Sequence, residues 1–280
     1  MTRLTFADIE SIDNELADYD AQLKRKTGRT LLEMACYANV CEARHVRKSQ
    51  DLARLAVVPM TGGDGLIAGF GETVRGIVRH IGFHATVTRN PDAAGLAEAV
   101  EGGNTHMIAA DDHRFFVLDF NKRLVFDKSE ATGCGFTAGL DLMAKGLQGK
   151  NVLVIGCGPV GRSAAKKALK LQADVTVCDR DRELGLRVAR RLSGEFGKHV
   201  SVSDDLAHAL STQSLIVDAS NAGGIIHARH IRPDAFIAAP GMPLGLTPAA
   251  REAIGDRLLH DPLQIGVATM VISALSRPGH

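Results

Sequence analysis

The pattern of apolar and polar positions changes its period repeatedly along the chain. Short apolar runs rich in β-branched residues predict strands at residues 55–60, 85–88, 105–110, 115–118, 123–126, 151–155, 174–179, 199–202, 215–218, 235–239 and 257–260. Apolar residues that recur every three or four positions predict helices at residues 6–26, 74–81, 93–100, 137–147, 162–171 and 183–193. Strands that alternate with helices are typical of an α/β fold with parallel sheets.

Two local patterns add detail. The runs at residues 115–118 and 123–126 are close enough in sequence to form an antiparallel hairpin. Thr247 followed by Pro248 predicts a helix start, because Thr is a good N-cap and Pro fits the first helical position.

The chain has 280 residues, a length that suggests two domains. We place the boundary near residues 146–150, just before the clearest βαβ unit. The predicted fold class is therefore α/β, with an N-terminal α/β substrate-binding domain of residues 1–148. A C-terminal Rossmann-type doubly wound parallel sheet of residues 149–280 follows it.

Composition narrows the function classes. Lys plus Arg number 33 and Asp plus Glu number 32, so the net charge of +1 leaves no excess to neutralise nucleic-acid phosphates. Aromatic residues make up 4%, which supplies few stacking platforms for bases. No apolar run is long enough to span a membrane, and the first residues lack a signal-peptide core. Five cysteines without regular spacing indicate reduced thiols and a cytoplasmic protein.

The most specific motif is a glycine fingerprint. Gly156, Gly158 and Gly161 follow a predicted strand and open a predicted helix, and Asp179 comes 18 positions after the last glycine. These glycines allow a tight turn, close approach of a pyrophosphate and close packing of helix on strand. The predicted cofactor-binding residues are Gly156, Cys157, Gly158, Pro159, Val160, Gly161, Asp179, Arg180, Ala219, Ser220, Asn221, Ala239, Pro240, Gly241 and Leu263.

The choice between NAD and NADP depends on the residues at the end of the strand predicted at residues 174–179. Asp179 would accept hydrogen bonds from the adenosine ribose and repel a 2′-phosphate, which favours NAD. Arg180 and Arg182 lie close by in sequence and could accept that phosphate, so NADP stays open.

Polar segments at strand ends are candidates for substrate binding. The turn Thr61-Gly62-Gly63-Asp64 could hold a carboxylate through its N–H groups, or it is a plain strand–helix connection. Asp111 and Asp112 could hold an ammonium, or they belong to a β-turn. Asp261 points at the same crevice, next to His260, which is either a proton acceptor or a structural residue.

Cys36, Cys41 and His45 have a spacing that invites a zinc interpretation. They supply only three good ligands, so a helix that carries two buried thiols is the preferred interpretation and no metal is expected.

Several strings resemble the dehydrogenases that complete pyrrolysine biosynthesis. The resemblance runs over most of the chain and rests on residues 58–67, 82–83, 90–92, 110–112, the glycine fingerprint, 240–243 and 260–270. It implies two α/β domains with the substrate between them and the N-terminal helix nearby. It also implies NAD-dependent oxidation of the terminal primary amine of 3-methyl-D-ornithyl-N6-L-lysine, a dipeptide, followed by loss of ammonia and closure of a pyrroline ring.

The same resemblance assigns residue roles. Asp111 is the expected catalytic residue, which holds the ammonium and takes its proton, provided that burial raises its pKa. The expected substrate-binding residues are Thr61, Gly62, Gly63, Asp64, Asp112 and Asp261. Gly62, Asp64 and Asp261 depart from the family pattern, which expects Ser, Asn and Glu there, so an altered substrate preference stays open.

Two other function classes remain as alternatives. A dehydrogenase of the methylene-tetrahydrofolate or shikimate type would be expected to carry a catalytic Lys in the N-terminal domain, where Lys48 is the only Lys between Lys26 and the hairpin. A dinucleotide-sensing protein without catalysis would need a basic DNA-binding module. Rossmann-type enzymes are commonly dimers, so a homodimer is an expectation.

Overall fold

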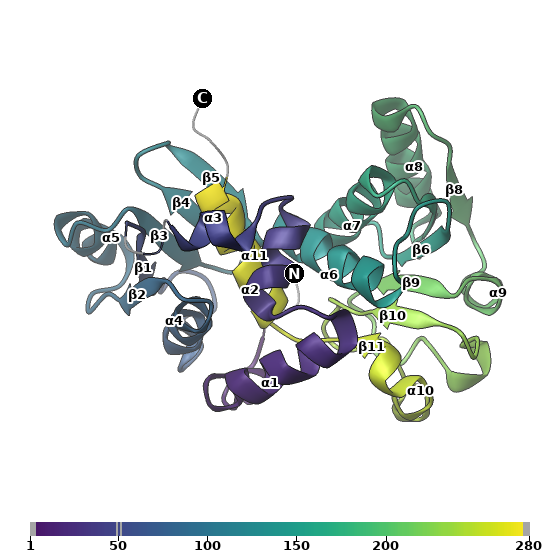
Figure 1. The fold of residues 1–280 in the computed structure, drawn as a ribbon, viewed down its shortest axis with the longest axis horizontal. Coiled ribbons are helices and arrows are strands. Elements are labelled where there is room, and N and C mark those ends of the chain that lie inside the picture. The colour runs from purple at the N-terminus through teal and green to yellow at the C-terminus, as the bar shows by residue number, and fades with distance from the viewer. Residues whose placement is uncertain (1–3, 49, 51, 277–280) are drawn as a thin grey trace.

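The computed structural model describes residues 4–48, 50 and 52–276 of the chain. It contains two β-sheets that lie side by side, with helices α1, α2, α6 and α11 between them (Figure 1). The predicted α/β fold class is confirmed. Among the described residues, no helix is long and apolar enough to cross a membrane.

The first sheet has five strands in the order β2-β1-β3-β4-β5. Strands β1 to β3 are parallel, and β4 and β5 form the predicted antiparallel hairpin. The elements of this half are η1 (Phe6–Asp8), α1 (Ile12–Thr27), α2 (Leu31–Ala38), α3 (Ala43–Arg47), β1 (Arg54–Val58), α4 (Phe70–His80), β2 (His84–Val87), α5 (Asp92–Glu101), β3 (His106–Ala110), β4 (Phe115–Asp119), β5 (Leu124–Asp127) and α6 (Lys128–Met143).

Alternating residues of β1 explain how this sheet is covered. Leu55 and Val57 pack with α4 on one face, whereas Ala56 and Val58 pack with Ala99 of α5 on the other. All four side chains are buried, as expected for a parallel strand covered on both faces. The small residues at 56 and 99 let α5 lie close to its face of the sheet.

The second sheet has six parallel strands in the order β11-β10-β9-β6-β7-β8. Numbered from its own first strand, this is the order 3-2-1-4-5-6 of a doubly wound dinucleotide-binding fold, read from β8. The elements are β6 (Asn151–Ile155), α7 (Pro159–Lys170), β7 (Asp174–Cys178), α8 (Arg182–Phe196), β8 (Val200–Ser203), α9 (Leu206–Thr212), β9 (Leu215–Asp218), η2 (Ala228–His230), β10 (Phe236–Ala238), α10 (Pro248–Ile254), η3 (Gly255–Arg257), β11 (Leu258–Leu259) and α11 (Gln264–Ser276). Thr247 caps α10 as predicted, accepting a hydrogen bond from Ala250 N at 3.3 Å.

Helix α6 begins at Lys128, well before the predicted start at residue 137. Its first half is rich in glycine and therefore lacks an apolar period. The glycines allow close packing: a Cβ atom on Gly133 would lie 2.3 Å from Val160 O of α7, and one on Gly135 would lie 2.5 Å from Thr269 Oγ1 of α11. The predicted helix over residues 6–26 is also divided, into η1 and α1, and α9 was not predicted.

Helix α11 returns from the second sheet to the first half of the chain, where it packs against α2, α4, α6 and the β4–β5 hairpin. The proposed boundary at residues 148/149 falls in the connection between α6 and β6. The last 13-residue helix therefore ties the two halves together and completes the core of the first.

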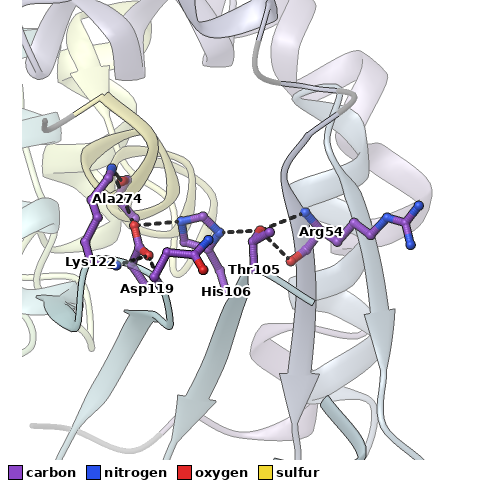
Figure 2. Close-up of polar contacts among 7 residues, drawn as sticks. Arg54, Thr105, His106, Asp119, Lys122 and Ala274 are labelled. Carbon is purple, nitrogen blue, oxygen red and sulfur yellow. Dashed lines mark hydrogen bonds and ion pairs between the residues drawn. The ribbon is translucent and has the colours of Figure 1, made fainter. Parts of the chain in front are cut away.

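A buried polar network fastens α11 to the first sheet (Figure 2). His106 Nε2 lies 3.4 Å from Asp119 Oδ2, and Lys122 Nζ lies 3.4 Å from the same oxygen while donating to Ala274 O of α11 at 3.1 Å. Thr105 Oγ1 lies 2.8 Å from the other His106 nitrogen, Nδ1. Burial lowers the pKa of His106 despite the opposing charge of Asp119.

This network predicts acid-sensitive folding. Because the pKa of His106 is lowered in the folded state, the unfolded chain takes up the proton first as pH falls, and stability is lost below the ordinary histidine pKa. One proton contributes a slope of up to about 1.4 kcal/mol per pH unit. We expect His106→Gln to flatten the pH dependence of thermal unfolding between pH 7.5 and 5, whereas His199→Gln at an exposed position leaves it unchanged. Equal pH slopes in wild type and His106→Gln would contradict this.

Candidate functional site

One large cleft of about 1090 Å³ lies between the two sheets. Its walls are the segments that follow the carboxyl ends of β1 and β3 in the first half, and of β6, β7, β9 and β10 in the second. Ligands of open α/β sheets bind at such strand ends, beside the switch point where the strand order reverses. Here that switch point lies between β6 and β9.

The glycine fingerprint forms the turn between β6 and α7. Gly156 has φ +87°, and a Cβ atom on it would lie 2.9 Å from the Ala219 backbone. A Cβ on Gly161 would lie 1.7 Å from Gly156 O, so this position must be glycine for the turn to close. Gly158 instead faces open space in the cleft. Together with the N–H groups of the first turn of α7, this cradle fits the pyrophosphate of a dinucleotide.

The acid at the end of β7 lies against that turn. Asp179 Oδ2 accepts a hydrogen bond from Cys157 N at 2.6 Å, and its Oδ1 accepts one from Asp181 N at 2.8 Å. Arg182 is exposed and pairs with Asp204 at 2.7 Å. Arg180 lines the cleft together with Asp179 and Asp204.

The turns after β9 and β10 touch each other. Gly241 N donates to Asp218 O at 3.1 Å, and a Cβ atom on Gly241 would lie 2.1 Å from Ser220 O. The predicted cofactor residues that line the cleft are Gly156, Gly158, Pro159, Val160, Asp179, Arg180, Ala219, Ser220, Asn221, Pro240 and Gly241. Those that do not line it are Cys157, Gly161, Ala239 and Leu263, which are all buried. Ala239 O accepts a hydrogen bond from His260 Nδ1 at 2.7 Å, which gives His260 a structural role.

The two candidate substrate segments of the first half meet. Asp112 Oδ2 accepts a hydrogen bond from Asp64 N at 2.6 Å, and a Cβ atom on Gly63 would lie 1.8 Å from the same oxygen. Asp64 and Asp112 line the cleft, but Thr61, Gly62 and Gly63 do not. Thr61 instead donates from its N to Asp92 Oδ1 at 2.8 Å, so it fastens the start of α5.

Asp111 lines the cleft, but its pKa is not raised as a catalytic base at this position would require. Its side chain is exposed, and Oδ1 accepts hydrogen bonds from His113 N at 2.8 Å and Arg114 N at 2.7 Å. The Arg114 and His113 hydrogen bonds lower the pKa of Asp111. The condition for a catalytic base, that burial raises this pKa, is not met, because the side chain belongs to a turn between β3 and β4. Asp111 supplies negative charge to the cleft and is a weak proton acceptor.

Asp261 lies behind the cleft wall rather than on it. Its side chain is 4% exposed, and Oδ2 accepts a hydrogen bond from the Tyr19 hydroxyl at 2.8 Å. Oδ1 accepts from Leu263 N at 3.0 Å and Ile265 N at 3.2 Å, at the start of α11. Burial raises the pKa of Asp261, opposed by the Tyr19 hydrogen bond. The expected direct contact between Asp261 and substrate does not fit this position.

Lys128, the first residue of α6, lines the cleft and was missed by the sequence prediction. Its Nζ lies 6.0 Å from the centre of the Phe115 ring. Ser129 and Thr132 of the same helix also line the cleft. Asp127 could have indicated in the sequence that a helix begins at Lys128. Its side chain accepts a hydrogen bond from Ser129 N at 2.8 Å and so caps α6. An Asp cap directly after the hairpin indicates that a helix starts there.

Cys36 and Cys41 do not line this cleft. Cys36 is buried on α2, whereas Cys41 is half-buried in the connection to α3 and its Sγ lies 3.5 Å from Cys36 O. The predicted single helix with two buried thiols is therefore wrong for Cys41. No group of three His, Cys, Asp or Glu side chains suited to a metal ion occurs among residues 4–48, 50 and 52–276.

Comparison with known proteins confirms the resemblance to the pyrrolysine-forming dehydrogenases. Residues 8–125 match the family described as "Pyrrolysine biosynthesis protein PylD, N-terminal domain", and residues 132–226 match "Alanine dehydrogenase/PNT, C-terminal domain". The chain is 26% identical to the pyrrolysine synthase of Methanosarcina acetivorans over 98% of its own length and 100% of that protein. The pyrrolysine synthase of Methanosarcina barkeri is also 26% identical, over 98% of both proteins.

Solved structures share the two-domain fold. The quinate dehydrogenase from Corynebacterium glutamicum in complex with NAD has a TM-score of 0.56 at 15% identity, over 81% of this chain and 94% of that one. A shikimate dehydrogenase in complex with NADP+ has a TM-score of 0.54 at 12% identity, over 79% and 88%. At these identities the likeness establishes the fold.

Proposed function

Because this chain resembles the pyrrolysine synthases from end to end and has the fold of a two-domain dehydrogenase, we propose that it catalyses the last step of pyrrolysine biosynthesis. Its substrate is 3-methyl-D-ornithyl-N6-L-lysine, and its cofactor is NAD. The observation that carries the proposal is the convergence of Asp64, Asp111 and Asp112 in the cleft that also contains the glycine cradle. Three carboxylates there suit a substrate that bears several ammonium groups.

The chemistry needs a neutral amine. When bound, NAD would supply the acceptor for the hydride that leaves the carbon carrying the terminal amine, so that the substrate would become an iminium ion. The other amine of the methylornithine unit then adds to that carbon, ammonia leaves, and the pyrroline ring closes. Asp111 and Asp112 hold the ammonium groups of the substrate in the cleft, and the apolar wall near Phe115 and Pro240 excludes water.

The charges around Asp179 support NAD as the cofactor. Asp179 and Asp204 both line the cleft, and Arg182 is engaged by Asp204, which leaves Arg180 as the nearby cleft-lining cation among the described residues. Two carboxylates disfavour a 2′-phosphate.

We expect Asp179→Ser to raise the KM for NAD at least tenfold and to increase the ratio of NADP to NAD turnover. The loss of the ribose contact weakens NAD, and the loss of the charge admits the phosphate. Steady-state kinetics with both nucleotides measures this, with Asp181→Ser as the control on the neighbouring exposed carboxylate. An unchanged ratio of NADP to NAD turnover would contradict the role of Asp179 in selecting NAD.

A second candidate is oxidation of a hydroxyl, as in the shikimate and quinate dehydrogenases. It is favoured by Lys128, because a cleft-lining Lys in the first half is the residue that this class is expected to carry. Assays at 340 nm with the dipeptide, shikimate and quinate, each with NAD and NADP, separate the two. Reduction of NAD by the dipeptide supports our proposal, whereas activity confined to shikimate or quinate establishes the second candidate.

The remaining parts of the proposal concern the setting of the enzyme. We propose a cytoplasmic location, supported by the five cysteines, whose irregular spacing indicates reduced thiols. A homodimer is the proposed assembly, to be checked by light scattering. Neither a nucleic acid nor a membrane is proposed as a partner.

A further inference from the structure

The proposed reaction lacks a proton acceptor among the residues assigned so far. The terminal amine enters the cleft as an ammonium ion, and it can lose a hydride only after it loses a proton. Asp111 is exposed, and the Arg114 and His113 hydrogen bonds lower its pKa, so it remains a carboxylate that accepts protons poorly. Asp261 does not line the cleft.

Lys128 has the position that this step requires. Its side chain crosses the first turn of α11, since a Cβ atom on Gly266 would lie 3.0 Å from Lys128 Cε. Its Nζ lies 6.0 Å from the centre of the Phe115 ring, which itself packs edge-on against Phe70. Lys128, Phe115 and Phe70 all line the cleft, so the amine sits in a largely apolar part of the wall.

Two carboxylates, Asp261 and Asp127, act on Lys128 through their charge, and both interact with other donors. Asp261 accepts from the Tyr19 hydroxyl and from two backbone N–H groups at the start of α11. Asp127 accepts from Ser129 N through Oδ1, and its Oδ2 lies 3.7 Å from Arg114 Nε. The negative charges of Asp261 and Asp127 therefore act on Lys128, although their oxygens interact with other groups. Burial lowers the pKa of Lys128, and the charges of Asp261 and Asp127 oppose this.

A second observation marks the same place. Thr132 lies one turn after Lys128 on α6 and lines the cleft, although its side chain is only 4% exposed. Its Oγ1 is buried without a hydrogen-bond partner among the described residues. The same Oγ1 would lie 2.6 Å from a Cβ atom on Gly266, so Thr132 and Lys128 lie together against α11. A buried hydroxyl without a hydrogen-bond partner is energetically costly. At a cleft wall it therefore indicates a position where a polar group of a ligand binds.

We propose that Lys128 is the catalytic base, which takes the proton from the substrate ammonium while the Thr132 hydroxyl accepts a hydrogen bond from the same nitrogen. The inference rests on the proposed amine oxidation. In the step, the N–H bond of the substrate breaks, its electron pair stays on the substrate nitrogen, and the neutral Lys128 amine becomes an ammonium. Solvent in the open cleft then removes that proton.

The test compares Lys128→Met and Lys128→Arg with wild type in the NAD-loaded enzyme. Arginine keeps the charge and length of the side chain but does not give up its proton at working pH. We expect both variants to lose about 100-fold in kcat/KM with NADH binding retained, as for loss of a general base. The low-pH limb of the profile should also move upward, toward the pKa of the free substrate amine, about 10. Lys48→Met, at an exposed position, is the control.

Titration of the amine itself gives an independent readout. In protein with 13C-methylated lysines, the resonance that is absent from Lys128→Arg should titrate at lower pH than the surface lysines as a group. Activity retained by Lys128→Arg, or a Lys128 resonance that titrates with the surface group, would overturn the proposal. If the wild type and the Lys128 variants all turn over the dipeptide, the proposed function stands and only the role of Lys128 as the base is contradicted. Inactive wild type with the dipeptide removes the proposed function and this inference together.

Discussion

Replacement of Asp111 by Asn is expected to abolish turnover of the dipeptide while NAD binding stays nearly intact. Asp111 lines the cleft from the first half of the chain, whereas the β6–α7 cradle belongs to the second half, and in our proposal Asp111 holds the ammonium next to the dinucleotide. The amide is nearly isosteric and can still accept from His113 N and Arg114 N, so the turn after β3 should survive. The lost charge should therefore appear in kcat/KM for the dipeptide and not in NADH affinity.

Steady-state kinetics and NADH fluorescence titration measure the two effects of Asp111→Asn separately. Asp18→Asn, on the exposed face of α1, is the control for a carboxylate outside the cleft. Full activity of Asp111→Asn would show that Asp111 does not bind the substrate. Loss of NADH affinity with unchanged turnover would show that Asp111 binds the cofactor instead.

The second large effect is expected in the glycine cradle. Gly158→Ala places a methyl group in the open space that the pyrophosphate is expected to fill, and we predict that it lowers NADH affinity at least 100-fold with little change in thermal stability. Gly161→Ala places a methyl group 1.7 Å from Gly156 O and should destabilise the apoprotein itself.

This pair of glycine variants separates cofactor binding from folding. Thermal unfolding without nucleotide measures stability, and fluorescence titration measures NADH affinity. If Gly158→Ala binds NADH normally, the cradle does not hold the pyrophosphate. If Gly161→Ala is as stable as wild type, the packing argument for that glycine is wrong.

The cofactor half was predictable because its chemistry is local. Gly156, Gly158 and Gly161 act through their own backbone turn, and Asp179 lies at the end of the adjacent strand. The glycine spacing, together with the predicted strand before it and the predicted helix after it, therefore indicated their arrangement. Asp64 and Asp112 were each predicted to follow a strand, and they meet because the ends of parallel strands share one edge of a sheet.

The substrate half depends on contacts between distant segments. Asp261 is buried because Tyr19, 242 positions earlier, covers it, and no local pattern carries that information. The pKa of Asp111 depends on exposure and on a tight turn, which strand prediction does not reveal. Lys128 was hidden because the glycines of α6 that let α7 and α11 approach also erase the apolar period of the helix.

The most direct test of the account uses the dipeptide carrying 15N at its terminal amine. Incubated with the enzyme and NAD, it should yield one NADH and one 15N-labelled ammonium per turnover, with an unlabelled product whose mass corresponds to pyrrolysine. Retention of the label in the product, or no NADH formed from the dipeptide while shikimate or quinate is oxidised, would contradict the proposed function.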